Sequence, residues 1–159
     1  MKKSAGILLF RLADERPEVF LVHPGGPFWV KKDEGSWSIP KGEFGENENP
    51  LDAARRELQE ETGILAEGSF IELTPVRQKS GKIIYPWALQ QDADPLSITS
   101  NFFEMEWPPK SGIKQSFPEI DRAAWFEFPE AKKKLVPGQV AILDELEKKL
   151  LQAKGMFYK

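Results

Sequence analysis

The chain has 159 residues, 40% of them hydrophobic and 30% charged, a composition typical of a globular domain, so we expect a single domain over residues 1–159. It has no cysteine, which excludes disulfides, thiolate zinc sites and cysteine nucleophiles, and fits a reducing compartment, so we expect a cytoplasmic protein. The formal net charge is only −3, which argues against general polyanion or DNA binding; attraction to a polyphosphate must come from local lysines or bound metal.

The N-terminal part of the chain predicts a β-hairpin followed by irregular structure. The apolar run at residues 5–12 predicts a strand, residues 13–17 a turn, and residues 19–22 the partner strand. Residues 23–29 contain two prolines and two glycines, which exclude regular structure and predict a loop. Residues 36–39 then predict a short extended segment.

Targeting and membrane segments are not indicated. The N-terminal lysines and short apolar run resemble the start of a signal peptide, but charged residues follow at once and no small-residue cleavage site is present. A strand is therefore favoured there. No apolar run approaches the roughly 18 residues that suggest a membrane span, so we expect no membrane partner.

Strong start and stop signals predict a helix of about a dozen residues near the middle of the chain. Asn49 is a good N-cap, and Pro50 suits the first helical position. Asp52 lies in the first turn, where the helix dipole favours negative charge, and Gly63 is a good C-terminal stop. Its apolar stripe consists of Leu51, Ala54 and Leu58.

The remaining sequence predicts further strands and two C-terminal helices. The predicted strands are residues 69–77, 83–90, 101–107 and 123–128, with a long irregular loop at 108–120 and helices at 129–135 and 138–153. In the last helix Leu143, Leu146 and Leu150 are expected to face the core. Because strands, hairpins and helices are intermixed, we expect the α/β (α+β) class, with a mixed sheet and helices on both sides.

The predicted central helix carries an unusual group of acids. In RRELQEETG, Glu57, Glu60 and Glu61 are spaced three and four residues apart, which puts their carboxylates on one face. One interpretation is a solvated helix face whose repulsion Arg55 and Arg56 relieve. The other is a metal site, and it is favoured by three more acids in the loop just upstream, which are Glu43, Glu46 and Glu48.

A loop that folds over this acidic face would concentrate negative charge, which is costly without a cation. Hard divalent cations such as Mg²⁺ and Mn²⁺ prefer carboxylate and carbonyl oxygens, and Mg²⁺ commonly shares a substrate phosphate. The sequence therefore indicates a metal site for phosphate chemistry.

Residues 42–64, GEFGENENPLDAARRELQEETGI, resemble the Nudix box, in which a glycine, a glutamate and an Arg-Glu-aliphatic-x-Glu-Glu-x-Gly-aliphatic run stand at fixed spacings. Every fixed position matches: Gly42, Glu48, Arg56, Glu57, Leu58, Glu60, Glu61, Gly63 and Ile64. The flanking order of strands also resembles the Nudix fold, which implies an α/β/α sandwich with a mixed central sheet.

The resemblance implies a hydrolase that cleaves a nucleoside diphosphate linked to another moiety, by attack of water on phosphorus. It implies one to three divalent cations, Mg²⁺ or Mn²⁺, as cofactors. Glu57, Glu60 and Glu61 would hold metal, together with the backbone carbonyl of Lys41. Arg56 and Glu48 would form a pair beside Gly42 that fixes the loop against the helix.

The reaction also needs a general base, and the resemblance leaves two candidates. Glu57 in the helix is our first choice. Glu119, in SFPEIDRAAWF, is the other, because it stands six positions before Trp125, as the catalytic-loop glutamate does in asymmetric diadenosine tetraphosphate hydrolases. The alternative for Glu119 is a solvent-exposed loop acid. Glu104 and Glu106 alternate with apolar residues and are expected on the solvent face of a strand.

The segment SWSIPKGE, residues 36–43, leads into the box. Its Ser-x-Pro-Lys-Gly pattern is similar to the diadenosine and diphosphoinositol polyphosphate branches of the family. Lys41 would then lie beside the polyphosphate as a point charge, although a surface lysine in a turn is the alternative. HPGGPFW and MEWPPKSG look like a bacterial branch of Nudix pyrophosphohydrolases, which brings no known substrate.

Other candidate substrate contacts carry weaker signals. His23 is the only histidine, which excludes a multi-histidine zinc site; it could contact a base or phosphate, or hold a turn. Tyr85, Trp87 and Trp107 could stack on a nucleobase, although aromatic residues in strands are usually core. Lysines in loops could reach outer phosphates, namely Lys110 together with Lys79, Lys82 and Lys114.

We therefore expect a metal-dependent pyrophosphohydrolase whose substrate is a dinucleoside polyphosphate such as diadenosine tetraphosphate. One alternative is a different substrate: another nucleotide, a diphosphoinositol polyphosphate, or the 5′-triphosphate end of an RNA. Another is a nucleotide-binding sensor without catalysis, but such proteins usually lose glutamates from the box. Both a monomer and a homodimer stay open.

Overall fold

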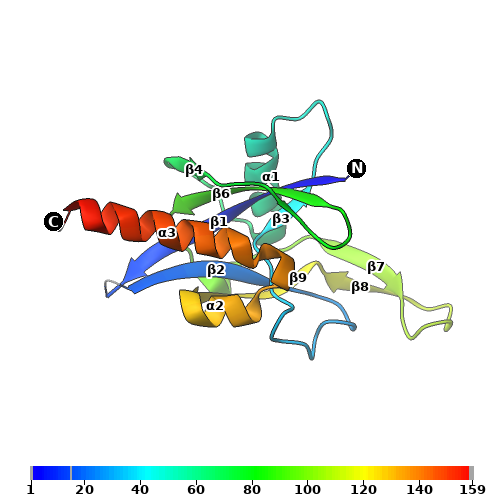
Figure 1. Ribbon diagram of the computed structural model, residues 1–159. Coiled ribbons are helices and arrows are strands. Elements are labelled where there is room, and N and C mark those ends of the chain that lie inside the picture. The colour runs from blue at the N-terminus through cyan, green and yellow to red at the C-terminus, as the bar shows by residue number, and fades with distance from the viewer. Residues whose placement is uncertain (1, 15, 158–159) are drawn as a thin grey trace.

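The computed structural model describes residues 2–14 and 16–157 of the chain and shows a central β-sheet with helices on either side (Figure 1). In chain order its elements are β1 (Lys3–Ala13), β2 (Arg16–Pro24), β3 (Lys41–Glu43), α1 (Pro50–Thr62), β4 (Phe70–Glu72), β5 (Val76–Arg77), β6 (Ile83–Gln90), η1 (Pro95–Ser97), β7 (Phe102–Glu106), β8 (Lys114–Pro118), β9 (Ile120–Glu127), α2 (Phe128–Lys134), η2 (Pro137–Gln139) and α3 (Val140–Phe157).

The main sheet is mixed, as the sequence predicted. Its strand order is β4-β6-β1-β2-β9, with β3 paired to β1 and β5 paired to β6. The β1–β6 pair is parallel, and every other pair in this sheet is antiparallel. The predicted hairpin of β1 and β2 is confirmed.

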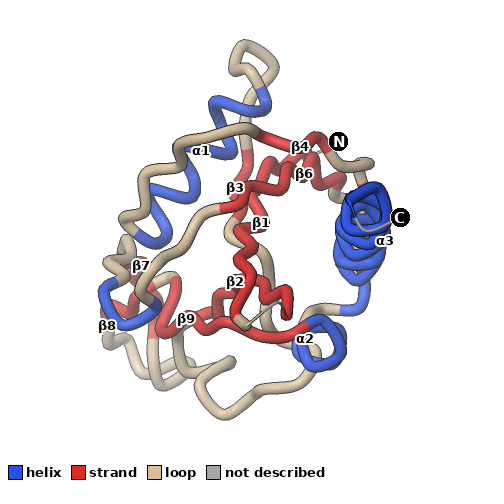
Figure 2. Tube along the Cα trace, turned by 90° about the vertical axis from the view of Figure 1, so that its left-hand side faces the viewer, coloured by secondary structure: helices blue, strands red, loops and turns tan. Residues whose placement is uncertain are grey.

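Alternation along β1 divides the apolar side chains between two cores. Ile7 and Leu9 face α1, whereas Leu8 and Phe10 face α2 and α3, and all four are buried. Successive side chains of a strand point to opposite faces, so a strand that is apolar throughout must be covered on both sides. Figure 2 shows α1 on one side of the sheet and α2 and α3 on the other, which confirms the α/β/α sandwich.

The predicted caps of α1 are confirmed. The Asn49 side chain accepts hydrogen bonds from the backbone N–H groups of Leu51 and Asp52, at 3.0 and 3.1 Å. Gly63 ends the helix with a φ of 80°, a conformation that favours glycine. Ala54 and Leu58 are buried against the sheet, so α1 is fixed by one face and offers its glutamates on another.

The strand predicted at 69–77 is interrupted at Thr74 and Pro75, although the preceding Leu73 N–H still donates to the Pro86 carbonyl of β6 at 3.0 Å. The Thr74 backbone N–H donates to the Glu145 carboxylate of α3, at 2.7 Å, and Pro75 has no N–H to donate. Two short strands, β4 and β5, result.

The predicted irregular loop at 108–120 was wrong in its second half. Residues 114–118 form β8, which pairs with β7 in a separate two-stranded antiparallel sheet. Residues 108–112, which contain two prolines and a glycine, lie in the connection between these two strands. Pairing partners across the turn, such as Glu104 and Ser116, have no local signature.

Among the helices that the structure describes, none is long and apolar enough to cross a lipid bilayer.

Candidate active site

The candidate site begins where Glu57 of α1 meets the short strand β3. The Glu57 carboxylate occupies the space above Gly42, so a Cβ built on Gly42 would lie 1.9 Å from the Glu57 carboxyl carbon. Pairing of β3 with β1 fixes the backbone at this point, with Gly42 opposite Ala5. Only glycine therefore lets the carboxylate approach the strand this closely.

Glu61 is held on the residue next to Gly42. Its Oε2 accepts a hydrogen bond from the Lys41 backbone N–H at 3.1 Å. Burial raises the pKa of Glu61 to about 8; the Lys41 ammonium and backbone N–H oppose this shift, and the Glu57 and Glu119 carboxylates add to it. Two carboxylates one helical turn apart are thus fixed on consecutive residues of β3.

Arg56 binds the acids of the loop and helix together. Its guanidinium donates to both oxygens of Glu48, at 2.8 and 2.9 Å, in the bidentate geometry that carboxylates favour. The same group donates to Glu57 at 2.8 Å and to Glu60 at 3.2 Å. Arg56 therefore attaches the loop before α1 to the helix and restrains the carboxylate of Glu57.

Glu119 directly follows β8, at the end of the β7–β8 hairpin that lies opposite its turn. Its N–H donates to the Asn101 carbonyl and its carbonyl accepts from the Gly25 N–H, both at 2.8 Å. The Asn101 N–H in turn donates to the Glu60 carbonyl, at 3.2 Å, so this segment is attached to α1. The Glu119 side chain is exposed, and its charge reaches the carboxylates of α1.

The pKa of Glu57 is affected by the same neighbouring carboxylates. Burial raises the pKa of Glu57; Arg56 opposes the shift, and the charges of Glu60 and Glu119 add to it. Repulsion of this kind among carboxylates from separate segments is relieved by a hard divalent cation. The donor chemistry of Glu57, Glu61 and Glu119 therefore fits such an ion.

Glu60 is placed differently from the other two helix glutamates. Its carboxylate lies against the Arg56 guanidinium, so it would reach a metal only by leaving that contact. Within residues 2–14 and 16–157, no three acidic or histidine side chains stand close enough together to form a complete ligand group. A cation at this site would therefore depend on side-chain adjustment, water or substrate oxygens for part of its coordination.

Lys41 lies at the edge of the same group of charges. Burial lowers the pKa of the Lys41 ammonium and the positive charge of Lys82 lowers it further, whereas the carboxylates of Glu61, Glu43 and Glu57 oppose the shift. Lys41 thus interacts with acids of α1 and β3 and with a second lysine.

His23 is part of the core and not of the site. Its side chain is fully buried, with Nδ1 2.8 Å from Asp121 and Nε2 2.6 Å from the Lys32 carbonyl oxygen. The ring also packs against Trp37, with ring centres 5.1 Å apart. Because both ring nitrogens are engaged within the protein, the structure supports the alternative that His23 holds a turn, and a substrate contact is not retained.

The aromatic candidates fall into two groups. Tyr85 packs against Phe44, with centroids 5.8 Å apart, and Trp87 packs on the core beneath α1. Trp107, at the end of β7, meets the exposed Phe28 edge-to-face at 5.4 Å. Sequence reasoning missed Phe28, because only the fold brings its loop to the hairpin. Lys110 is exposed in the turn of that hairpin, and Glu104 and Glu106 are exposed on β7, as predicted.

Gln139, of η2, is another residue that sequence reasoning missed. Its side chain is fully buried, and its Oε1 accepts from the Ile39 N–H at 3.0 Å while Nε2 donates to the Ser38 hydroxyl at 3.0 Å. It therefore fixes the segment that leads into Lys41 and Gly42. A glutamine one hundred residues from its partners gives no signal in the sequence.

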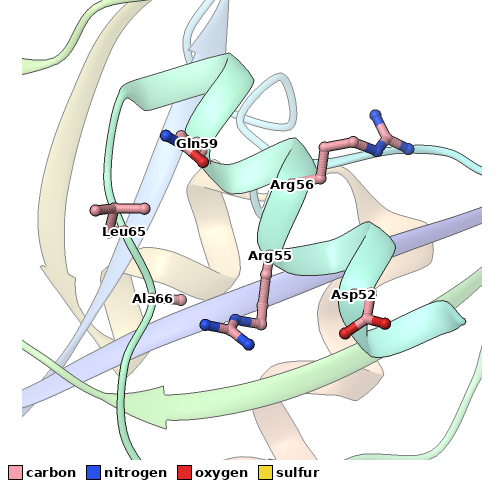
Figure 3. A pocket seen from close by; sticks show the side chains of 6 residues that line it. All are labelled: Asp52, Arg55, Arg56, Gln59, Leu65 and Ala66. Carbon is pink, nitrogen blue, oxygen red and sulfur yellow. The ribbon is translucent and has the colours of Figure 1, made fainter.

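A separate hollow of about 200 Å³ lies on the outer side of α1. Figure 3 shows Arg55 and Arg56 on this helix pointing in different directions. The hollow is lined by Asp52, Arg55, Arg56, Gln59, Leu65 and Ala66. None of the acids that gather around β3 lines it, and Arg56 is the residue that it shares with the candidate active site.

Comparison with known proteins identifies the family. The NUDIX domain profile matches residues 2–146, and the chain therefore belongs to the Nudix family, whose hydrolases generally use divalent metal ions. An RNA pyrophosphohydrolase of Bartonella henselae is 71% identical over 67 residues, which are 40% of this chain and 36% of that protein. The match thus covers only about a third of that relative.

Solved structures support the same fold. The NUDIX domain of Shewanella oneidensis NrtR complexed with ADP ribose has a TM-score of 0.65 at 16% identity, covering 93% of this chain and 87% of that one. A C. elegans Ap4A hydrolase binary complex has a TM-score of 0.63 at 17% identity, covering 94% and 98%. At these identities the likeness concerns the fold alone.

Proposed function

We propose that this protein is a metal-dependent Nudix pyrophosphohydrolase that cleaves a nucleoside polyphosphate by attack of water on phosphorus. One observation carries the proposal. Carboxylates from two distant segments, Glu57 and Glu61 of α1 and Glu119 after β8, gather near Lys41, whose backbone N–H holds Glu61 at 3.1 Å, and the charge of Glu119 adds to the raised pKa values of Glu57 and Glu61. A group of acids with a neighbouring cation is suited to bind metal and phosphate together.

Glu57 and Glu61 would hold the cation, with Glu60 and the backbone carbonyl of Lys41 as further ligands. The number of ions is one to three, and Mg²⁺ or Mn²⁺ suits the oxygen donors. When bound, the cation would lower the pKa of the attacking water and neutralise phosphate charge. Arg56 and Glu48 hold the loop in register with α1, and Gly42 leaves room for the Glu57 carboxylate.

Glu57 is our first candidate for the general base. Its pKa is raised toward neutral pH, and a general base is most effective when its pKa lies near the working pH. The Arg56 guanidinium donates to its carboxylate at 2.8 Å and so fixes its orientation. Glu119 is the second candidate, since its backbone is fixed by hydrogen bonds to Asn101 and Gly25 while its side chain is exposed. The base accepts the proton of the attacking water on a carboxylate oxygen.

We favour a dinucleoside polyphosphate such as diadenosine tetraphosphate as substrate. The Ser-x-Pro-Lys-Gly entry supports it, since it places Lys41 beside the acids of α1. The exposed Phe28 and the half-buried Trp107 offer a pair of aromatic rings, and such rings stack on nucleobases.

A second candidate substrate is the 5′-triphosphate end of an RNA. It is favoured by the 71% identity, over 67 residues, with a protein named RNA pyrophosphohydrolase. The two candidates share a nucleoside that carries a polyphosphate chain, so the same acids would act on both. A cytoplasmic location stays an expectation from the lack of cysteine.

The test is phosphate or nucleotide release across a substrate panel with Mg²⁺, with Mn²⁺ and with a chelator. The panel holds diadenosine tetraphosphate, 5′-triphosphorylated RNA, ADP-ribose, nucleoside triphosphates and a diphosphoinositol polyphosphate. Metal-dependent turnover of the first, with Glu57→Gln inactive, is the expected result. Preferential turnover of the RNA would select the second candidate. Nucleotide binding without turnover of any member would contradict the hydrolase and favour a sensor.

A further inference from the structure

Glu119 lies in the bend between β8 and β9, and hydrogen bonds hold its backbone from two sides. On one side its N–H donates to the carbonyl of Asn101, the residue before β7, at 2.8 Å. On the other side its carbonyl accepts from the N–H of Gly25, the residue after β2, also at 2.8 Å. Because Glu119 belongs to neither strand, its position depends on these two neighbouring segments.

The next residue, Ile120, is held by the side chain of Ser100. The Ile120 N–H donates to the Ser100 hydroxyl oxygen at 3.0 Å, and the same hydroxyl donates to the Asn101 carbonyl at 2.9 Å. That carbonyl is also the acceptor for Glu119, so one hydroxyl joins both hydrogen bonds. The Ile120 side chain is buried in the same core cluster as Leu58 of α1, which restricts the bend further.

The segment 99–101 is in turn fixed to the last turn of α1. The Thr99 N–H donates to the Thr62 carbonyl at 3.0 Å, and the Asn101 N–H donates to the Glu60 carbonyl at 3.2 Å. The last carbonyls of a helix have no partner within the helix, so they can accept such bonds from another segment. Segment 99–101 is therefore attached to the turn of α1 that carries two of the helix glutamates.

These bonds connect the backbone of Glu119 with the acids of α1. The charge of the Glu119 carboxylate adds to the raised pKa values of Glu57 and Glu61, so its distance from them matters. The Glu119 side chain is exposed, and its place is set by where its backbone is held. Loss of the Ser100 hydroxyl would free the Ile120 N–H and loosen this bend next to Glu119.

From these contacts we propose that Ser100 is a positioning residue, which holds the Glu119 carboxylate near the acids of α1 by binding the Ile120 N–H. The inference rests on the proposed function, and it assigns to Ser100 an effect on the rate that is transmitted through Glu119. A serine that only stabilised the fold would lower the melting temperature and leave the rate of the folded chain unchanged.

The first measurement is amide hydrogen exchange of the full chain by NMR, in a chelator and without substrate. Ser100→Ala should speed exchange of the Ile120 N–H by about tenfold, because one hydrogen bond is lost. Ser100→Thr keeps the hydroxyl and should stay within about threefold of wild type. Ser97→Ala is the matched control, since the Ser97 hydroxyl binds Asp94 at 2.8 Å in the same connection between β6 and β7, and it should change nothing at Ile120.

The second measurement is steady-state kinetics on the substrate that the panel identifies. Ser100→Ala should lower kcat about five- to tenfold and leave KM within about twofold, because a misplaced catalytic group weakens the transition state more than substrate binding. Ser100→Thr should restore most of this loss. In the Glu119→Gln chain, Ser100→Ala should change kcat by no more than about twofold, because two residues that act through one another are not additive.

A second variant covers the case in which Ser100→Ala does not fold. Ser100→Cys keeps the size of the half-buried side chain but has only a weak donor and acceptor, so it should show the same faster exchange and the same loss in kcat.

Unchanged exchange of the Ile120 N–H in Ser100→Ala would overturn the inference, as would a wild-type kcat. A full loss that persists in the Glu119→Gln chain would also overturn it, because Ser100 would then act by another route. An equal loss in Ser97→Ala would do the same, because it would indicate a general effect of the connection. Faster exchange in Ser100→Ala, with no turnover of any panel member by the wild-type chain, would contradict the proposed function and leave the anchoring of Glu119 by Ser100 standing.

Discussion

Position 42 has no side chain, and the Glu57 carboxylate uses the space that a methyl group would fill. The neighbouring Lys41 N–H holds Glu61 at 3.1 Å, and Arg56 holds Glu57 at 2.8 Å. At the residue scale, therefore, the candidate site consists of carboxylates fixed against a strand by a missing Cβ, a backbone donor and a guanidinium. Each of these contacts can be tested separately.

Gly42→Ala should inactivate the protein without unfolding it. The new Cβ would meet only the end of the flexible Glu57 side chain, which can move away, but the carboxylate then leaves its position. We expect a loss of about a hundredfold or more in kcat/KM on the substrate found in the panel, since small misplacements of a catalytic group are this costly. Gly45→Ala is the matched control, because a Cβ there has open space around it.

Steady-state kinetics and circular-dichroism melting would be measured on both variants. Full activity of Gly42→Ala would show that the approach of Glu57 to β3 is not needed for catalysis.

The two candidate bases can be separated by neutral substitutions. Glu57→Gln should lower kcat by about a thousandfold, since it removes a metal ligand and the favoured base together, whereas Glu119→Gln should cost about ten- to a hundredfold. Glu104→Gln, an exposed acid on the same hairpin as Glu119, should have no effect. A larger loss in Glu119→Gln than in Glu57→Gln would exchange the two assignments.

The raised pKa of Glu61 predicts how the stability of the metal-free protein depends on pH. The folded chain holds this proton up to about pH 8, whereas an unfolded glutamate releases it near 4.5. The stability it contributes is therefore fully present below about pH 4.5 and is lost as pH rises through about 8. Glu61→Gln lacks this loss, so its melting temperature relative to wild type should rise from pH 5 to pH 8.

Thermal melts of both chains in a chelator would give this difference at each pH. A difference that stays constant across the range would show that Glu61 does not hold a proton in the folded state.

At the scale of elements, the segment before β3 depends on η2. The buried Gln139 accepts from the Ile39 N–H at 3.0 Å and bonds to the Ser38 hydroxyl, and two residues later the chain reaches Lys41.

Elements with strong local signals were predicted well, as for α1, whose Asn49 cap and Gly63 stop lie within its own sequence. Elements defined by distant partners, such as β8 and the break between β4 and β5, were not.

Gln139→Ala should destabilise the protein and disturb the entry to the site. It leaves the buried Ile39 N–H without a partner, which costs about 1–3 kcal/mol in the free energy of unfolding. Denaturant unfolding would measure this loss. Gln152→Ala, an exposed glutamine of α3, should stay within about 0.5 kcal/mol of wild type. Equal stability of both variants would mean that Gln139 does not hold the segment.

At the scale of the whole molecule, the sheet lies between two layers of helices, and its strands pack against both. The layer of α1 carries the candidate catalytic acids, and Gln139 of η2, between α2 and α3 in the chain, contacts Ser38 in the segment that leads to β3. A ligand that binds only the folded chain should therefore stabilise the molecule as one unit.

Mg²⁺ should raise the melting temperature of the wild-type chain in proportion to the logarithm of its concentration once the site is saturated, because it relieves repulsion among the acids. The rise should be absent in Glu57→Gln and present in Glu104→Gln. Differential scanning calorimetry with and without a chelator measures it. An equal rise in all three chains would indicate non-specific ion effects rather than the proposed site.

The sequence by itself determined the family box, the helix that carries it and the mixed sheet between helices, because these depend on local spacing, caps and apolar alternation. Only the tertiary structure decided that Glu119 lies within electrostatic reach of Glu57 and Glu61, that both His23 nitrogens are engaged in the core, and that Glu60 pairs with Arg56. Glu119 and His23 meet partners far away in the sequence, and only the packing of the chain brings such residues together. Glu60 has several possible partners near it in the sequence, and the folded structure decides which of them it contacts. No local sequence pattern predicts either outcome.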